Sequence, residues 1–500
     1  MTDIENILKQ RIERFSPRIK ASGVGKIISI GDGVATISGL SGAIMAEILA
    51  FPQKTYGLVL NLEKHFIGAI ILGPSRHLKA GDEVSTTGKV LQVPVGDSLI
   101  GRIINPLGKP LDGLPLPKTS QFNPLERIAA GVVTREKVNT PVQTGILSVD
   151  SMIPIGRGQR ELIIGDRSTG KSAIALTTVI NQKNKHLICI YVVIGQKAAF
   201  TSQLVATLKQ YKAMEHTIII AANASDPPAL QYLAPYAGAA VAEYFCQQGK
   251  DALVIYDDLT KHAWAYRELS LLLKRPSGRE AYPGDVFYLH SRLLERALKY
   301  NKENGGGSIT ALPIVETQAG DVSGYIPTNI ISITDGQIYL ETDLFNAGIR
   351  PAINAGLSVS RVGGNAQVKA MRRVSGRLRI ELSQFRELAA FAQFSSDLDP
   401  ATKAQLDRGS RITEILKQGW DEPMPVEHQV VLIWAVTNGF LDKIPVNKVK
   451  LWQSEYIKYL SSAHPLLLQN IVKELDISDK TAKSLTQVTG RFNDSREEKL

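Results

Sequence analysis

Different patterns of apolar residues follow one another along the 500-residue chain. In residues 23–93, short runs of β-favouring residues alternate with glycine turns. For example, Gly31-Asp32-Gly33 separates the run at 26–30 from the run at 34–38. Such a turn between two short apolar runs predicts a hairpin. A succession of hairpins predicts a small β-barrel or sandwich.

The patterns change twice further along the chain. In residues 94–369, apolar strand-like runs alternate with helical stretches, which is typical of a mostly parallel α/β sheet. After residue 370, apolar side chains recur at intervals of three and four, as at Met371, Val374 and Leu378. This spacing predicts amphipathic helices over residues 370–500.

Residues 1–22 carry a single apolar stripe at helical spacing, formed by Ile4, Ile7, Leu8, Ile12 and Phe15. The stripe predicts a helix, either an ordinary surface helix or a docking helix for another protein. Both alternatives stay open. The acidic residues of this segment and its lack of an apolar core argue against a transit or signal peptide.

Composition excludes several classes of protein. Hydrophobic residues make up 44% and charged residues 21% of the chain, which is ordinary for a globular protein, and no apolar run is long enough to span a bilayer. Cys189 and Cys246 are predicted to be small buried residues in a reducing compartment. The net charge of +10 comes without interleaved aromatic residues, so we expect a basic face toward anionic lipid or an acidic partner and no nucleic-acid partner.

One octapeptide carries recognisable chemistry: Gly165-Asp166-Arg167-Ser168-Thr169-Gly170-Lys171-Ser172 fits the phosphate-loop (P-loop) pattern G-x-x-x-x-G-K-S/T. It lies between an apolar run and a helix-like stretch, as a P-loop requires. The glycines let backbone N–H groups turn toward phosphate oxygens, while Lys171 reaches the β- and γ-phosphates and Ser172 ligates Mg²⁺. The alternative is a glycine-rich turn without a ligand. The context favours a site for a nucleoside triphosphate and Mg²⁺.

Residues after the P-loop indicate how the site would hold Mg²⁺ and whether it would hydrolyse the nucleotide. Residues 251–258 form an apolar strand that ends in Asp257 and Asp258, and we expect Asp257 to hold Mg²⁺ through water. The strand at 187–195 is followed by Gln196, where a hydrolase of this kind needs a group that polarises the attacking water. An amide has the shape of glutamate without its basicity. Glutamine can orient water, as in some GTPases, so a catalytic site stays an alternative. The sequence favours a site that binds nucleotide and turns it over poorly or not at all.

These patterns predict a multidomain α/β protein. We expect an N-terminal docking helix (1–22), a β-barrel (23–93), a central RecA-like P-loop nucleotide-binding domain (94–369) and a C-terminal α-helical bundle (370–500).

The chain also resembles the alpha subunits of F-type ATP synthases over about residues 1–460. The resemblance depends on long blocks: PVQTG (141–145), DSMIPIGRGQRE (150–161), GQK (195–197), REAYPGD (279–285), ISITDGQ (331–337) and SVSRVG (358–363). It implies a hexamer of three alpha and three beta subunits around a gamma shaft, with delta or peripheral-stalk subunits at the N-terminus. That complex makes ATP from ADP and phosphate with a proton gradient. It is peripheral on the inner face of a bacterial plasma membrane, or of an organelle membrane for an organelle-encoded chain.

In that family, catalysis occurs on beta at its interface with alpha, and alpha keeps a Mg-ATP of its own. The resemblance implies that Arg361 is the arginine finger reaching the beta site, where a guanidinium shares transition-state charge. Ser332 matches a residue near the same interface.

The resemblance assigns further positions of the nucleotide site one by one. Arg167 matches the arginine of the P-loop, and Glu316 matches a residue near the metal and phosphates. Arg350, Pro351 and Gln418 match positions lining the adenine pocket.

Some residues depart from the family. Ser168 stands in place of a glutamine, Ser172 in place of a threonine, and Trp420 where a second adenine-contacting glutamine is common. Ser172 keeps the hydroxyl for the metal, whereas Ser168 and Trp420 lose an amide. The chain is therefore either a main alpha subunit or a divergent second copy.

Alternative functions remain open from the residues alone. A RecA-type homohexameric motor, such as an RNA translocase or secretion ATPase, also fits a β-rich N-terminal domain and a basic charge. Gln196 argues against it, because a homohexamer needs its own base. A regulatory nucleotide-binding scaffold outside any rotary machine is a third alternative.

Overall fold

The structure, a computed structural model, describes residues 23–392 and 399–496. The stripe and the docking helix predicted for residues 1–22 lie outside these described ranges. The chain divides into two compact units at Leu91/Gln92, and the first unit also includes Leu272–Lys274.

The first unit is a closed antiparallel barrel with strand order β1-β2-β5-β4-β3-β6. Its strands are β1 (Val24–Gly31), β2 (Val34–Ser38), β3 (Glu47–Phe51), β4 (Thr55–Leu62), β5 (Ile67–Ile71) and β6 (Glu83–Val90). Every second side chain points inward, so that Ile37, Leu49 and Val59 are fully buried. The predicted β-barrel is confirmed, and closure leaves the sheet without an open edge.

The second unit contains a mostly parallel sheet with strand order β19-β18-β12-β17-β15-β13-β14-β8. Its strands are β8 (Ile103–Ile104), β12 (Leu162–Asp166), β13 (Leu187–Ile194), β14 (Thr217–Ala222), β15 (Asp251–Asp257), β17 (Ser308–Thr317), β18 (Gly336–Leu340) and β19 (Val359–Ser360). The strands from β18 to β8 run parallel, and β19 is antiparallel to β18. The continuous apolar runs of the inner strands suit a sheet that is covered on both faces.

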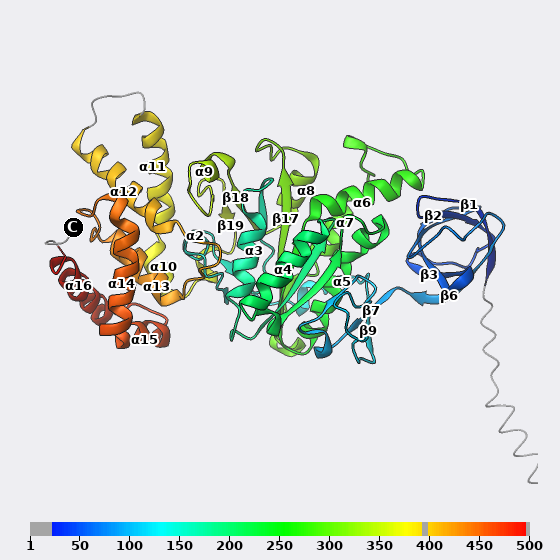
Figure 1. The fold of residues 1–500 in the computed structure, drawn as a ribbon, viewed down its shortest axis with the longest axis horizontal. Coiled ribbons are helices and arrows are strands. Elements are labelled where there is room, and N and C mark those ends of the chain that lie inside the picture. Colours follow the sequence, from blue (N-terminus) through cyan, green and yellow to red (C-terminus); the bar gives the residue numbers. More distant parts are fainter. Residues whose placement is uncertain (1–22, 393–398, 497–500) are drawn as a thin grey trace, which may run out of the picture. The chain divides into compact units, whose positions relative to one another are not determined.

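Helices cover this sheet (Figure 1). They are α3 (Lys171–Ile180), α4 (Ala198–Gln210), α5 (Pro228–Gln247), α6 (Leu259–Leu272), α7 (Val286–Leu294) and α8 (Tyr325–Ile333). Helix α5 packs on β13, β14 and β15. Short elements complete the region: β7 (Gln92–Val95) with β9 (Gln121–Pro124), β10 (Pro141–Val142) with β11 (Ile155–Gly156), β16 (Leu298–Lys299), α2 (Leu147–Met152) and α9 (Thr342–Asn346).

The end of the chain is helical, as the spacing of apolar residues predicted. The helices are α10 (Lys369–Ser375), α11 (Leu378–Ala392), α12 (Pro400–Leu416), α13 (Val426–Thr437), α14 (Val449–Ala463), α15 (Pro465–Glu474) and α16 (Asp479–Asp494). The stacked rings of Trp452 and Tyr456, 4.6 Å apart, and Phe492 join α14 to α16. Among the described helices, none is both long and apolar enough to cross a membrane.

The two cysteines are buried and unbonded, as predicted. Burial raises the pKa of both thiols, that of Cys246 to about 12. Their role is therefore packing.

A buried ion pair ties the segment after α7 to helix α5. The Arg296 guanidinium donates to both carboxylate oxygens of Glu243, at 2.7 and 2.9 Å, and to the backbone oxygen of Leu125 at 2.7 Å. The Arg296 side chain is only 1% exposed. Removing one partner of such a pair leaves the other charge buried and uncompensated.

We therefore expect Arg296→Met to lower the free energy of unfolding by about 3–5 kcal/mol. The matched control is Lys250→Met, because Lys250 pairs with Asp97 at 3.0 Å on the surface. There we expect about 1 kcal/mol or less. Urea denaturation measures the free energy of unfolding of both variants. Equal losses would contradict the stabilising role assigned to the buried Arg296–Glu243 pair.

Candidate functional site

The P-loop connects the end of β12 to the start of α3, as its sequence context predicted. Gly165 has no room for a side chain, since a Cβ there would lie 2.5 Å from the backbone oxygen of Leu340. Gly170 has φ +100°, and Ser168 also adopts a positive φ of 64°. The Lys171 ammonium donates to the backbone oxygen of Gly165 at 2.8 Å, so it lies across the loop.

The side chain of Asp166 fastens the loop to the sheet. Its carboxylate accepts hydrogen bonds from the Thr317 hydroxyl (2.6 Å), the Gly320 N–H (2.9 Å) and the Thr342 hydroxyl (2.9 Å). Thr169 donates to the Asp166 backbone oxygen at 2.8 Å. The Asp166 carboxylate is thus bonded to the end of β17, the turn after it and the start of α9.

A pocket of about 490 Å³ lies against the P-loop and the carboxyl ends of β13, β15 and β17. It is lined by four cations and three carboxylates, namely Arg167, Lys171, Lys197, Lys261, Asp257, Asp258 and Glu316, together with Gln196, Ser168, Gly170 and Ser172. Cations near backbone N–H groups at a helix N-terminus suit phosphate oxygens.

The candidate metal ligands are Ser172 and Asp257, and a buried tyrosine contacts Asp257. The hydroxyl of Tyr191, fully buried on β13, donates to Asp257 Oδ2 at 2.7 Å. Burial and the Asp257 charge raise the pKa of Tyr191 well above its usual value, so it stays a neutral donor. Ser172, on α3, and Asp257, at the end of β15, line the same pocket. A hydroxyl and a carboxylate are hard oxygen ligands, which fits Mg²⁺ that keeps several waters.

Gln196 follows β13 and faces these acids. Its amide nitrogen donates to Asp257 Oδ1 at 2.8 Å and to Asp258 Oδ2 at 3.3 Å. Because both contacts use N–H donors, the amide is oriented with its nitrogen toward the carboxylates. Its nitrogen acts as a neutral donor there, and its amide oxygen is a much weaker base toward water than a carboxylate.

Buried charges balance one another around Lys171. Burial lowers the pKa of Lys171, whereas Glu316, Asp258 and Asp257 oppose this change. Lys261 forms an ion pair with Asp258 and lies 3.7 Å from Glu316 Oε2. Burial nevertheless raises the pKa of Asp258 to about 6, with the ion pair opposing the shift and the nearby Asp257 adding to it.

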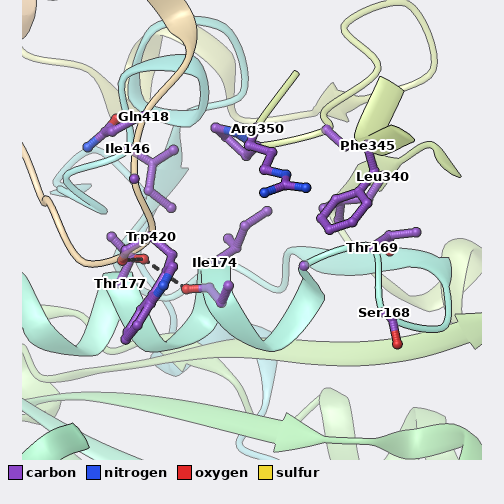
Figure 2. Close-up of a pocket in the computed structure, with 15 residues that line it drawn as sticks. Ile146, Ser168, Thr169, Ile174, Thr177, Leu340, Phe345, Arg350, Gln418 and Trp420 are labelled. Carbon is purple, nitrogen blue, oxygen red and sulfur yellow. Dashed lines mark hydrogen bonds between the residues drawn. The ribbon is translucent and has the colours of Figure 1, made fainter. Parts of the chain in front are cut away.

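A second pocket, of about 400 Å³, adjoins the first, since Ser168, Gly170 and Ala173 line both. Its walls are mainly apolar and come from distant segments: Ile146, Ile174, Leu340, Phe345, Pro351, Ala352 and Trp420, with Arg350, Gln418 and Thr177 among them. Figure 2 shows the Arg350 side chain near Phe345, and Trp420 beside Thr177. The guanidinium carbon of Arg350 lies 4.5 Å from the centre of the Phe345 ring. An apolar hollow beside a phosphate-binding pocket has the layout of a nucleotide site.

Arg361 and Ser332 line neither of these two pockets. Both residues are exposed. Arg361 follows β19, and its N–H donates to the backbone oxygen of Asp335 at 2.8 Å. The Asp335 carboxylate is held by Arg160 through a pair of 2.9 Å hydrogen bonds, so the backbone that carries Arg361 is fixed.

The structure therefore brings together the P-loop, Gln196, Asp257 and Glu316 in one pocket, and Arg350, Pro351 and Gln418 in the other. Sequence reasoning missed Tyr191 and Lys261. Tyr191 is the one polar-tipped residue in the apolar run LICIYVVI, and Lys261 lies one helical turn after Asp258. Both positions stand out in the sequence, but the sequence alone does not show which residues their side chains contact. The apolar residues that line the second pocket have no sequence feature that marks them as part of a site.

The parallel sheet, the P-loop and the two adjoining pockets define a P-loop nucleotide-binding protein. Three family models match the chain in succession: the ATP synthase alpha/beta family beta-barrel domain (residues 21–88), nucleotide-binding domain (145–360) and C-terminal domain (367–492). Proteins named ATP synthase subunit alpha from two strains of Dehalococcoides mccartyi are 60% identical over 97% of this chain and 96% of theirs. One from Syntrophomonas wolfei subsp. wolfei is 58% identical over 98% of both chains. The chain therefore belongs to the ATP synthase alpha/beta family, in the subunit alpha group.

The Asp258 carboxyl yields a pH prediction. Its raised pKa means that the folded chain binds this proton more tightly than the unfolded chain, so its contribution to stability falls as pH rises from about 4 to about 6. Asp258→Asn removes this dependence. The stability of the unchanged protein relative to the variant should fall by about 2–3 kcal/mol between pH 4 and pH 7, measured by urea denaturation. If the difference in stability between the unchanged protein and Asp258→Asn did not depend on pH, the raised pKa of Asp258 would be contradicted.

Proposed function

We propose that this chain is the alpha subunit of a proton-translocating ATP synthase, that it holds Mg-ATP at a non-catalytic site, and that it supplies an arginine finger to an adjacent beta subunit. The observation that carries the proposal is the amide of Gln196 at the carboxyl end of β13. Its nitrogen is engaged by Asp257 and Asp258, at 2.8 and 3.3 Å. A catalytic site needs a group that accepts or orients the proton of water at this place. The amide nitrogen is committed as a donor, and the amide oxygen is a weak base, so the pocket binds the nucleotide and turns it over poorly or not at all.

The residues in the two pockets support the assignment of the ligand. Lys171 and Arg167 meet the phosphates, Ser172 binds Mg²⁺, and Asp257 binds it through water. Glu316 lies near the metal and phosphates. The ion would neutralise phosphate charge and fix the nucleotide in place. The base occupies the apolar pocket with Arg350, Pro351 and Gln418 around it.

The place of Arg361 supports its action in trans. It is exposed on a fixed backbone and lies outside the lining of the pockets that this chain builds for its own nucleotide. A guanidinium held in this way suits a neighbouring site in which phosphate charge develops during reaction. Ser332, exposed on α8 close to Asp335, belongs to the same contact surface.

The assembly follows from the same assignment. We propose an alternating hexamer with beta, a gamma subunit in its centre and peripheral-stalk subunits at the N-terminal segment. The proton path lies in membrane subunits, so this chain is peripheral, on the inner face of the membrane. The domain limits 1–22, 23–93, 94–369 and 370–500 remain predictions.

The isolated full-length chain provides the first test. We expect it to bind Mg-ATP and to release no phosphate over many hours, because it lacks a base of its own. Lys171→Met should weaken binding at least tenfold, whereas Lys183→Met, an exposed lysine after α3, should leave it unchanged. Calorimetry and a phosphate-release assay measure these outcomes. Steady phosphate release by the chain alone would favour the homohexameric motor instead.

The assembled complex provides the second test. Arg361→Ala should keep assembly and nucleotide content but lower ATP turnover by about 10³-fold or more, as for other arginine fingers. The control is Arg491→Ala, which removes an exposed arginine from α16. Turnover and bound nucleotide are measured on the same preparations. Near-normal turnover of Arg361→Ala would remove the finger from the proposal.

A further inference from the structure

Asp257 is a buried acid whose two carboxylate oxygens are both bonded to uncharged donors. The residue is only 1% exposed. The Tyr191 hydroxyl donates to Oδ2 at 2.7 Å, and the Gln196 amide nitrogen donates to Oδ1 at 2.8 Å. The neighbouring acid differs, because the Asp258 carboxylate forms an ion pair with Lys261. The charge of Asp258 is thus neutralised within the chain, whereas these two bonds to Asp257 come from neutral groups.

The register of the sheet places the Tyr191 side chain near Asp257. Strands β13 and β15 are parallel neighbours, with Val193 opposite Asp257 and Tyr191 two residues earlier on β13. Side chains two residues apart on a strand point to the same face of a sheet, and residues directly opposite each other share a face. Tyr191 is also fully buried, so close packing fixes its ring. The sheet itself therefore holds the hydroxyl at Asp257.

The two donors determine the orientation of the Asp257 carboxylate. An ionised carboxylate accepts hydrogen bonds only, so the single proton of the Tyr191 hydroxyl points at Oδ2. Rotation of the carboxylate would break this bond and the bond from Gln196 together. Each carboxylate oxygen has about two lone-pair sites, so each can still accept a hydrogen bond from a water molecule. Asp257 is thereby fixed in place with capacity left for the waters around a metal ion.

A hydrogen bond to a metal-binding carboxylate affects how tightly the metal is held. Loss of such a partner costs about 10- to 100-fold in metal affinity, because the partner orients the ligand. Resting on the proposed function, we propose that Tyr191 is a positioning residue for the hydrated Mg²⁺ of the bound nucleotide. It acts through Asp257, and it is not part of the lining of the P-loop pocket.

The test compares Tyr191→Phe with the unchanged full-length chain, both depleted of nucleotide. The substitution removes one hydroxyl and keeps the buried ring. Calorimetry measures the affinity for ATP in the presence of Mg²⁺ and again with EDTA in its place. We expect Tyr191→Phe to bind Mg-ATP more weakly, by about tenfold or more. Its affinity for metal-free ATP should equal that of the unchanged chain, because the hydroxyl acts through the metal ligand.

Tyr236→Phe is the matched control. Tyr236 is also buried, and its hydroxyl donates to the backbone oxygen of Leu289 at 2.9 Å. It lines neither pocket of the nucleotide site. Thermal unfolding checks that both variants are folded, and Tyr236→Phe should leave both affinities unchanged. The inference would be overturned if Tyr191→Phe weakened ATP equally with and without Mg²⁺, or if Tyr236→Phe weakened Mg-ATP as much as Tyr191→Phe.

A double-mutant cycle with Asp257→Asn tests the route of the effect. Since Tyr191 acts through Asp257, the two substitutions are not additive, and adding Tyr191→Phe to Asp257→Asn should weaken Mg-ATP by about twofold at most. Additive losses would rule out the positioning role. Mg-ATP binding that is unchanged in Tyr191→Phe would overturn the inference and leave the proposed nucleotide site in place. An unchanged chain that binds ATP neither with nor without Mg²⁺ would overturn both.

Discussion

The order of strands in the parallel sheet is the constraint on which the whole site depends. Because β12, β17, β15 and β13 lie next to one another and run in the same direction, their carboxyl ends meet at one edge. The P-loop, Glu316, Asp257 and Gln196 each lie at or just after one of these ends. Residues separated by more than a hundred positions in sequence thereby share one pocket, as is general for open α/β sheets.

The balance of charges in that pocket explains why it suits a bound nucleotide. Lys171 and Lys261 lie among three carboxylates, so in the absence of ligand each cation has partners of opposite charge. Tyr191 adds a neutral donor beneath Asp257. A pocket arranged in this way holds its cations and its metal-binding oxygens in place before a ligand arrives, which lowers the cost of ordering them.

The apolar pocket beside the P-loop is lined by segments that lie far apart in the sequence. Ile146 precedes α2, Phe345 belongs to α9, and Gln418 and Trp420 follow α12. A ligand in this pocket contacts all of them at once. Binding to the folded state alone stabilises it in proportion to the occupancy of the site, so a retained nucleotide would join the sheet to the helical domain.

The amino-acid sequence by itself determined the β-barrel, the parallel sheet, the helical end of the chain and the position of the P-loop. These features depend on local spacing: alternation in strands, intervals of three and four in helices, and a glycine pattern around a lysine. The periodic run after residue 370 is one sequence pattern, yet the structure breaks it at Gly376 between α10 and α11.

Only the tertiary structure decided which side chains meet. Tyr191 had no stated partner until the β13–β15 pairing placed it beside Asp257. Gln418 lines the apolar pocket, and its amide also forms hydrogen bonds with Gly145, Leu147 and Glu422, which the sequence did not indicate. The physical reason is that a side-chain hydrogen bond requires atoms about 3 Å apart, and that distance is set by chain segments far away in sequence.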